Sequence, residues 1–362
     1  MIPLVKPFLP PKEKLLPALE QTLYSGYIAE GAVVKNFEDA IGEFIGNKLV
    51  LSLNSGTAAL HLALILAGVK AGDEVISTVL TAEPTNVAIK QTGARIVWAD
   101  IDYQTGTISA KSVREKITPL TKAIMLVHYA GVVGDLAELS IIAAEYKIPI
   151  IEDAAHALGA KFDYRYIGSI SDYTIFSFQA IKHMTTIDGG LLAVKNVDDY
   201  DSAKRRRWFG LDKSQPRLDN DITEVGYKYH MNNVNATVGL VQMEYLKMNI
   251  EKHISNGQYF DDNLANVPGI EVLQYYSKTY PSYWLYTMKV EKRSDFIYAL
   301  ECAGIVASEL HLRNDRHSIF RESKTTLPVF DAFYSKMVHI PCGWWVTAED
   351  RTRIVEVIKK GW

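Results

Sequence analysis

Residues 49–67, LVLSLNSGTAALHLALILA, place a short apolar run, a glycine-containing turn and an apolar helical segment one after another. The run Leu49 to Leu53 has the length of a buried strand, and Ala58 to Ala67 has the spacing of a helix. Strand–turn–helix units of this kind build mostly parallel sheets that helices cover on both faces. This stretch therefore predicts an α/β fold.

The same alternation continues through the first two-thirds of the chain. Further strands are expected at residues 74–77, 95–99, 123–128, 148–151 and 191–194, and helices at residues 37–45, 85–91 and 136–146. After about residue 245 the pattern changes, with strands expected at 270–273 and 284–290 and helices at 293–303 and 348–359. We expect a large domain over residues 1–245, including an N-terminal arm, and a smaller C-terminal α+β domain over residues 246–362.

Composition narrows the class of protein. The 362 residues carry a net charge of −3, so no nucleic-acid partner is expected, and the basic run Lys204–Arg207 is interpreted as a solvated helix face. The two cysteines, Cys302 and Cys342, show no metal-site or disulfide spacing. The most apolar stretch, Ala58 to Val69, is too short to span a membrane, and the proline-rich N-terminus does not resemble a signal peptide. These features predict a cytoplasmic protein without a metal site.

A candidate phosphate site lies in the opening stretch, in the turn Asn54-Ser55-Gly56-Thr57. A glycine lets the backbone approach a ligand closely, and the N–H groups at a helix start attract an anion. The alternative is an ordinary helix cap by Asn54, Ser55 or Thr57.

Two further segments carry candidate chemistry just past apolar runs, where ligands bind in open parallel sheets. The carboxylate of Asp153 ends a buried run and needs a positively charged partner, for which a pyridinium nitrogen would serve. The alternatives are a structural carboxylate and, for the nearby His156, a histidine satisfied within the core. Lys182 follows the run Phe176 to Phe178, and a lysine deep in a fold must lose its charge, find a partner or form an imine. The alternative is that Lys182 reaches solvent.

The combination of these segments resembles the sugar aminotransferases of the DegT/StrS group, within the fold-type-I enzymes that use pyridoxal 5′-phosphate (PLP) and fold like aspartate aminotransferase. The resemblance runs nearly from end to end. Its motifs are Ser25-Gly26-Tyr27, Phe37-Glu38, residues 55–60, Gly72 to Ile76, Gly93-Ala94, Asp100 to Asp102, Glu152 to His156, Gly168-Ser169, Asp172, Phe176 to Phe178, Lys182, Asp188 to Gly190 and Gly226 to Tyr229.

The resemblance implies roles for the matching residues. Lys182 would hold the cofactor as a Schiff base and move the proton during catalysis, and Asp153 would pair with the pyridine nitrogen. His156 stands where the family usually has glutamine, near the ring hydroxyl.

The resemblance also implies a phosphate site and a second subunit. Gly56, Thr57 and Ser177 match phosphate contacts. Lys228 stands where many members have an asparagine that reaches the cofactor phosphate of the neighbouring subunit, so a homodimer is expected. The alternative for the segment around Lys228 is that it simply leads into the next helix. Ala82 departs from the pattern, because many members carry there an aromatic residue that stacks on the cofactor ring, and His230 replaces a common arginine.

Substrate contacts are expected from His183 and from the polar segment 308–317, which includes His311 and Arg313. The alternative for that segment is a surface loop.

The activity implied by the resemblance is transfer of an amino group from L-glutamate or L-glutamine to a nucleotide-linked keto-sugar. Its products would serve amino-sugar and surface polysaccharide biosynthesis, including lipopolysaccharide. Two alternatives remain at this point. One is a PLP-dependent sugar dehydratase of the same fold, although those relatives carry histidine where this chain has Lys182. The other is a non-enzymatic PLP-binding sensor, although no DNA-binding module is recognisable.

Overall fold

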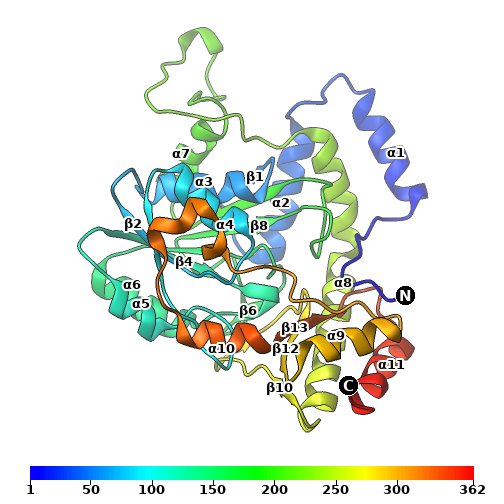
Figure 1. The fold of residues 1–362 in the computed structure, drawn as a ribbon. Helices are drawn as coiled ribbons and strands as arrows, with labels where there is room; N and C mark the ends of the chain where they lie inside the picture. Colours follow the sequence, from blue (N-terminus) through cyan, green and yellow to red (C-terminus); the bar gives the residue numbers. More distant parts are fainter.

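The structure is a computed structural model that describes residues 1–362, and its centre is a seven-stranded sheet (Figure 1). The strand order is β1-β9-β8-β5-β4-β2-β3. The strands are β1 (Val50–Leu53), β2 (Glu74–Ser77), β3 (Arg95–Trp98), β4 (Thr121–Val127), β5 (Ile150–Asp153), β8 (Tyr173–Ser177) and β9 (Gly190–Val194). Only β9 runs antiparallel to its two neighbours; the other strand pairs are parallel. The predicted α/β fold with a mostly parallel sheet is confirmed.

Alternate residues of the central strands enter two separate apolar cores, one on each face of the sheet. In β5, for example, Ile151 belongs to one core and Ile150 to the other. The first core is closed by α3 (Gly56–Leu66), α4 (Glu83–Gln91) and α7 (Val197–Arg207). The second is closed by α2 (Ala32–Ile45), α5 (Ala110–Lys116), α6 (Leu136–Tyr146) and the first half of α8 (Asn233–Leu264). Burial on both faces explains why these strands read as continuous apolar runs.

A third apolar core lies around a three-stranded antiparallel sheet in the C-terminal part. Its strands are β10 (Ile270–Val272), β12 (Tyr286–Val290) and β13 (Met337–Ile340), and its helices are α9 (Arg293–Cys302) and α11 (Ala348–Lys359). The N-terminal Ile2 also packs into this core. Helix α8 runs unbroken through residue 245, so the domain boundary that we expect there remains a prediction and has no break in the backbone to mark it.

The remaining elements are short or peripheral. They are α1 (Lys12–Leu23), α10 (Pro328–Lys336), the strands β6 (Lys161–Phe162), β7 (Arg165–Tyr166) and β11 (Thr279–Tyr280), and the 3₁₀ turns η1 (Tyr129–Gly131), η2 (Arg217–Asp219), η3 (Asn314–Arg316) and η4 (Ser318–Ser323). Helix α1 was not expected from the proline-rich N-terminus; it packs on α8. The segment that contains η3 and η4 crosses from the C-terminal sheet to lie beside β3 and α4 (Figure 1).

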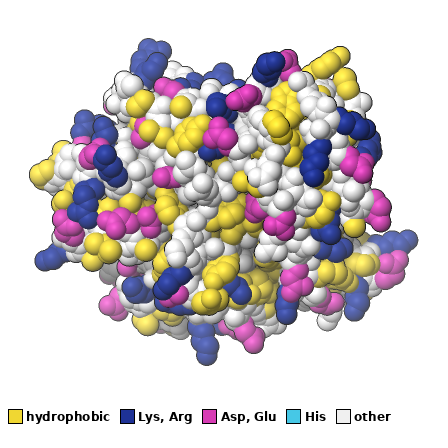
Figure 2. All heavy atoms as spheres, turned by 90° about the horizontal axis from the view of Figure 1, so that it is seen from below, with side chains coloured by type: hydrophobic (Ala, Val, Ile, Leu, Met, Phe, Trp, Pro, Cys, Tyr) yellow, Lys and Arg dark blue, Asp and Glu magenta, His cyan; other side chains and the backbone are white.

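The surface of the molecule has one projecting segment and no large area of a single charge on the face shown in Figure 2. The segment between α7 and α8, residues 208–232, projects away from the body of the molecule (Figure 1). On the face seen in Figure 2, basic and acidic side chains are interspersed and neither sign covers a large area. None of the helices is both long enough and apolar enough to cross a membrane.

Candidate active site

A cavity of about 360 Å³ lies at the carboxyl ends of the central strands, where an open parallel sheet binds its ligands. It is lined by the turn after β1, the start of α4, the ends of β5 and β8, and the segments that follow them. Of the residues with predicted roles, the cavity lining includes Gly56, Thr57, Asp153, His156, Ser177, Lys182 and His311. Residues that are far apart in the chain are thus brought around one space.

The turn after β1 is built to receive an anion. Ser55 caps α3, with its side chain accepting a hydrogen bond from the Ala58 backbone N–H at 3.1 Å. The first N–H groups of a helix, here those of Gly56 and Thr57, have no acceptor within the helix. A methyl group on Gly56 would come within 3.1 Å of the Ser177 Cβ, so a larger residue would narrow the space between turn and strand. This arrangement suits a phosphate.

Asp153 ends β5 with its carboxylate buried at the cavity wall. Its Oδ2 accepts a hydrogen bond from the Thr85 hydroxyl at 2.6 Å, and its Oδ1 accepts one from the Ala155 N–H at 3.1 Å. Burial raises the pKa of Asp153, and these two hydrogen bonds and the charge of Lys182 oppose that rise. The carboxyl group makes no ion pair within the chain, so a cationic ligand atom would be the partner that favours its ionised form.

His156 presents an unpaired hydrogen-bond donor to the cavity. Its ring stacks on Trp284, with centroids 3.9 Å apart and planes inclined by 19°. Its Nδ1 accepts a hydrogen bond from the Ala130 N–H at 3.3 Å, and burial holds the pKa of His156 well below its usual range. The ring is therefore neutral with its proton on Nε2, and that atom is buried without a partner. A ligand oxygen is the kind of acceptor that would satisfy it.

Lys182 lies in the cavity wall, and as a whole residue it is half-buried. Burial is the main influence on its amine and lowers the pKa of Lys182 to about 8, against an opposing contribution from Asp153. The Nζ of Lys182 lies 4.2 Å from the centre of the Trp284 ring, and the Trp284 indole N–H donates to the Ile181 carbonyl at 2.9 Å. The ring therefore packs against the side chain, and the lowered pKa makes the neutral amine more accessible near neutral pH than in a solvated lysine.

These features fit PLP as the cofactor of this site. Gly56, Thr57 and Ser177 would hold its phosphate, Asp153 its ring nitrogen and His156 its ring hydroxyl, while Lys182 would bind its aldehyde carbon. The fit rests on the unpaired donor of His156, the buried carboxyl group of Asp153 at the cavity wall and the narrow turn at Gly56.

The other predicted residues lie differently. The His183 ring points away from the cavity, where it bonds the Ser282 carbonyl at 3.1 Å and packs on His253. Arg313 is held by two carboxylates, at 2.6 Å from both Asp315 and Asp331, and does not line the cavity. His311 does line it, and burial lowers the pKa of His311 to about 4. Of these three, only His311 is placed to touch a substrate.

Lys228 is fixed by its backbone and free at its side chain. Asn54, next to the phosphate turn, donates from its amide to the Lys228 carbonyl at 3.2 Å and from its backbone to the Tyr229 carbonyl at 2.7 Å. The Lys228 side chain is exposed and does not line the cavity of its own chain.

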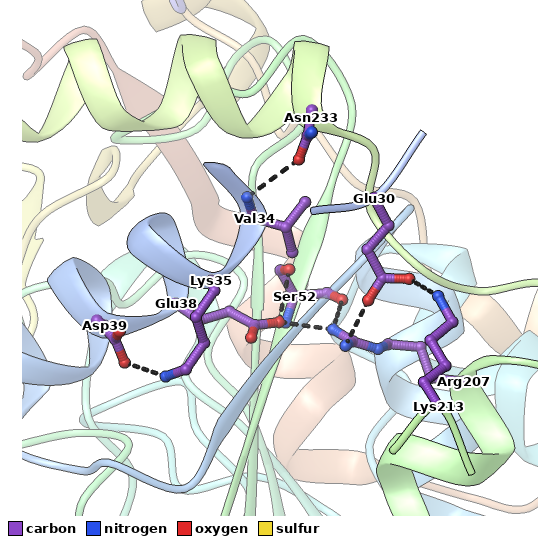
Figure 3. A network of polar contacts seen from close by, with 9 residues as sticks. All are labelled: Glu30, Val34, Lys35, Glu38, Asp39, Ser52, Arg207, Lys213 and Asn233. Atoms are coloured by element: carbon purple, nitrogen blue, oxygen red, sulfur yellow. Dashed lines mark hydrogen bonds and ion pairs between the residues drawn. The ribbon is translucent and has the colours of Figure 1, made fainter. Parts of the chain in front are cut away.

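Arg207 anchors the projecting segment to the central sheet (Figure 3). Its guanidinium donates to Glu38 at 2.5 Å, to the Ser52 carbonyl at 2.9 Å and to Glu30 at 3.0 Å. Interpreting residues 204–207 as a wholly solvated helix face is therefore wrong at Arg207, whose side chain is 9% exposed. It fits Lys204, whose side chain is 49% exposed. A basic residue can face inward here because two carboxylates meet it.

The sequence predicts neither Thr85, which lines the cavity, nor Trp284, which packs behind Lys182 and His156 without lining it. Thr85 is the fourth residue after Thr81, and its role depends on how α4 approaches β5. Trp284 belongs to the C-terminal part, and it meets Lys182 only because the two parts pack together. No local pattern signals either contact.

Comparison with known proteins gives a consistent result. The sequence profile of the DegT/DnrJ/EryC1/StrS aminotransferase family matches residues 11–359. The crystal structure of AtS13 from Actinomadura melliaura is 39% identical, with a TM-score of 0.97 over 100% of this chain and 99% of that one. The sugar aminotransferase CalS13 from Micromonospora echinospora is 37% identical, with a TM-score of 0.96 over the full length of both chains. The putative sugar aminotransferase Spr1654 from Streptococcus pneumoniae, in its PLP form, is 27% identical, with a TM-score of 0.91 over 99% of this chain and 98% of that one.

Proposed function

The chain belongs to the DegT/DnrJ/EryC1/StrS aminotransferase family and is a PLP-dependent sugar aminotransferase of fold type I, and from this premise we propose its substrates and its catalytic residues. The amino donor is L-glutamate or L-glutamine, and the acceptor is a nucleotide-linked keto-sugar. The observation that carries the proposal is the placement of the Lys182 amine, with its pKa lowered to about 8, in a cavity that also presents Asp153 and His156.

Lys182 moves the proton in this proposal. When bound, PLP supplies an electron sink for the charge left on the donor α-carbon. The neutral Nζ of Lys182 accepts the proton that leaves this α-carbon and would deliver it to the cofactor carbon that is bonded to the transferred nitrogen. In the second half of the reaction the same amine would take a proton back from that cofactor carbon and deliver it to the sugar carbon that carried the keto group. A general base works best when its pKa lies near the working pH, and burial brings the Lys182 amine close to that range.

Asp153 and His156 keep the cofactor in place and in the right charge state. The Asp153 carboxylate would favour a protonated ring nitrogen, and the neutral His156 would donate from Nε2 to the ring hydroxyl. The Ser55–Thr57 turn would hold the phosphate at the start of α3. Because these groups would bind different parts of the cofactor, namely its ring nitrogen, its ring hydroxyl and its phosphate, together they would fix its orientation.

Charge in the cavity supports a contribution from a second subunit. Lys182 is the only lysine or arginine in the lining, whereas Glu83, Asp153 and Asp188 are acidic. A nucleotide diphosphate and a donor carboxylate both need cations. We infer that the exposed Lys228 of a second copy of this chain supplies one of them at the cofactor phosphate.

Exposed apolar side chains support a homodimer. Two segments are rich in them: residues 16–28 near the N-terminus and the projecting segment 208–232. They are Leu16, Leu23, Tyr24, Tyr27 and Ile28 in the first and Phe209, Leu218, Ile222 and Val225 in the second. Apolar side chains gathered in this way are typical of protein interfaces, and most such assemblies are symmetric.

The products would be amino sugars for surface polysaccharides, a destination that the family suggests. Lys182 argues against the dehydratase alternative, because histidine cannot form the covalent bond that lysine forms with an aldehyde. His183, which follows it, is turned toward Ser282 and does not replace it.

A panel of nucleotide-linked keto-sugars tests the proposal. Each is incubated with the PLP-loaded enzyme and either glutamate or glutamine, and the mass of the product is measured. We expect an amino sugar from at least one acceptor and none with Lys182→Ala. Dehydrated product without amine incorporation would favour the dehydratase, and no product across the panel would contradict the choice of acceptor.

A further inference from the structure

Two threonine hydroxyls form a chain behind the buried carboxylate of Asp153. The Thr85 Oγ1 lies 2.6 Å from Asp153 Oδ2, and the Thr81 Oγ1 lies 2.7 Å from the Thr85 Oγ1. The side chains of both threonines are buried, at 2% or less exposure. No other hydroxyl group approaches either carboxylate oxygen of Asp153.

The two hydrogen bonds that link Thr81, Thr85 and Asp153 run in one direction, because each threonine hydroxyl has a single hydrogen to donate. An ionised carboxylate only accepts, and therefore the single hydroxyl hydrogen of Thr85 points to Asp153. The Thr85 oxygen is then free to accept from Thr81, and this polarises the first bond further. Reversal would require a proton on Asp153.

Hydrogen bonds of the next residue, Asn86, hold the backbone around Thr85 in position. Asn86 accepts from the Ser77 hydroxyl at 2.7 Å and donates to the Thr78 carbonyl at 3.0 Å and to the Asn314 side chain at 2.8 Å. The start of α4 therefore cannot rotate, and the β-branched side chain of Thr85 has few rotamers. Its hydroxyl is held toward Asp153 before any ligand binds.

We infer that Thr85 is a positioning residue for the cofactor: its hydroxyl, backed by Thr81, keeps the Asp153 carboxylate ionised and aimed at the ring nitrogen. The inference rests on the proposed role of Asp153 in the aminotransferase.

The surroundings of Asp153 show why this hydroxyl matters. The other groups that stabilise its negative charge are the Ala155 N–H on Oδ1 and, at longer range, Lys182 and His128. Burial acts against all of them and raises the pKa of Asp153. Without the Thr85 hydroxyl, Oδ2 has no donor, so the carboxyl group takes up a proton more readily and attracts a protonated ring nitrogen less.

Three variants isolate this effect. Thr85→Val removes the hydroxyl at nearly constant volume, Thr85→Ser restores it, and Thr81→Val removes only the second link. Thr107→Val is the matched control, because Thr107 is a buried threonine paired with Thr105 and lies outside the cavity lining. The measurements are the dissociation constant for PLP, from spectral titration of the cofactor-free chain, and the pH dependence of the bound cofactor's absorbance.

We expect Thr85→Val to weaken PLP binding roughly 10- to 100-fold, the range for losing a hydrogen bond to a charged group. The transition of the absorbance with pH should move in the same variant. Thr81→Val should have a smaller effect in the same direction, and Thr85→Ser and Thr107→Val should bind like the unmodified chain. Equal losses in Thr85→Ser and Thr85→Val, or an unchanged Thr85→Val, would overturn the inference.

A double variant separates this inference from the proposed function. If Thr85 acts through Asp153, adding Thr85→Val to Asp153→Asn causes no further loss of PLP affinity. Additive losses would show a role that is only structural. If Asp153→Asn itself binds PLP normally, the proposed role of Asp153 fails; if it binds poorly while Thr85→Val binds normally, only the role of Thr85 fails.

Discussion

The amine of Lys182 lies over the ring of Trp284, with Nζ 4.2 Å from the ring centre. The lysine comes from the segment after β8, and the tryptophan comes from the segment before β12 of the C-terminal sheet. His156 stacks on the same indole. Packing between the two parts of the chain therefore sets the environment of the proposed catalytic amine.

Removing the Trp284 ring should change the pH at which the enzyme works. Burial is the largest influence that lowers the pKa of Lys182, so Trp284→Leu, which admits water, should raise this pKa from about 8 toward its usual value of 10.5. The limb of the pH–rate profile that reports deprotonation of Lys182 then moves to higher pH. Trp284→Phe, which keeps a ring, should move it less.

A control tests whether this shift is specific. Trp98 is equally buried but packs on Phe320, away from the cavity lining. Trp98→Leu should lower stability and leave the pH–rate profile unchanged. A profile for Trp284→Leu that matches the unmodified enzyme would contradict the role given to this ring.

Mixed dimers test the proposed site between two subunits. A Lys182→Ala chain paired with a Lys228→Ala chain should contain one intact site, with Lys182 from one chain and Lys228 from the other. We expect about half of the activity of the unmodified dimer at limiting PLP, as one of two symmetric sites is whole. Activity no higher than that of the Lys228→Ala homodimer would place Lys228 in its own chain's site or in none.

The Arg207 network should contribute strongly to stability. Arg207→Met leaves the buried carboxylate of Glu38 without its cation (Figure 3). Breaking a buried pair in this way costs about 3–5 kcal/mol of the free energy of unfolding, measured by urea denaturation. The matched control is Lys204→Met on the same helix, whose exposed pair with Asp201 should contribute at most about 1 kcal/mol. Similar losses in the two variants would argue against the network.

The fold could be predicted from sequence because its strands are buried on both faces and separated by glycine-rich turns. The expected strand at 74–77 and the helices at 136–146 and 348–359 have the observed bounds. Helical spacing of apolar residues in the sequence at 236–246 predicts only part of α8, which continues to Leu264. Beyond Ile250 its buried apolar residues belong to the third core and no longer to the second, so one periodic pattern does not describe the whole helix.

The candidate site could be predicted only in part. Gly56, Asp153 and Lys182 each follow an apolar run, and topology brings the ends of parallel strands together. Thr85 and Trp284 could not be predicted, because their contacts depend on tertiary packing. His183 is next to Lys182 in the chain, yet its ring points away from the cavity, which sequence proximity alone does not reveal.

We propose above that the Lys182 amine moves the proton during amino transfer. The most direct test compares Lys182→Ala with the unmodified enzyme in the turnover of a nucleotide-linked keto-sugar with glutamate, after spectral titration has shown that the variant still binds PLP through its remaining contacts. Removing a general acid–base group typically costs ~10²–10⁴-fold in rate, and we expect a loss of at least this size. Near-normal turnover by Lys182→Ala would contradict the account and would require another base in the cavity.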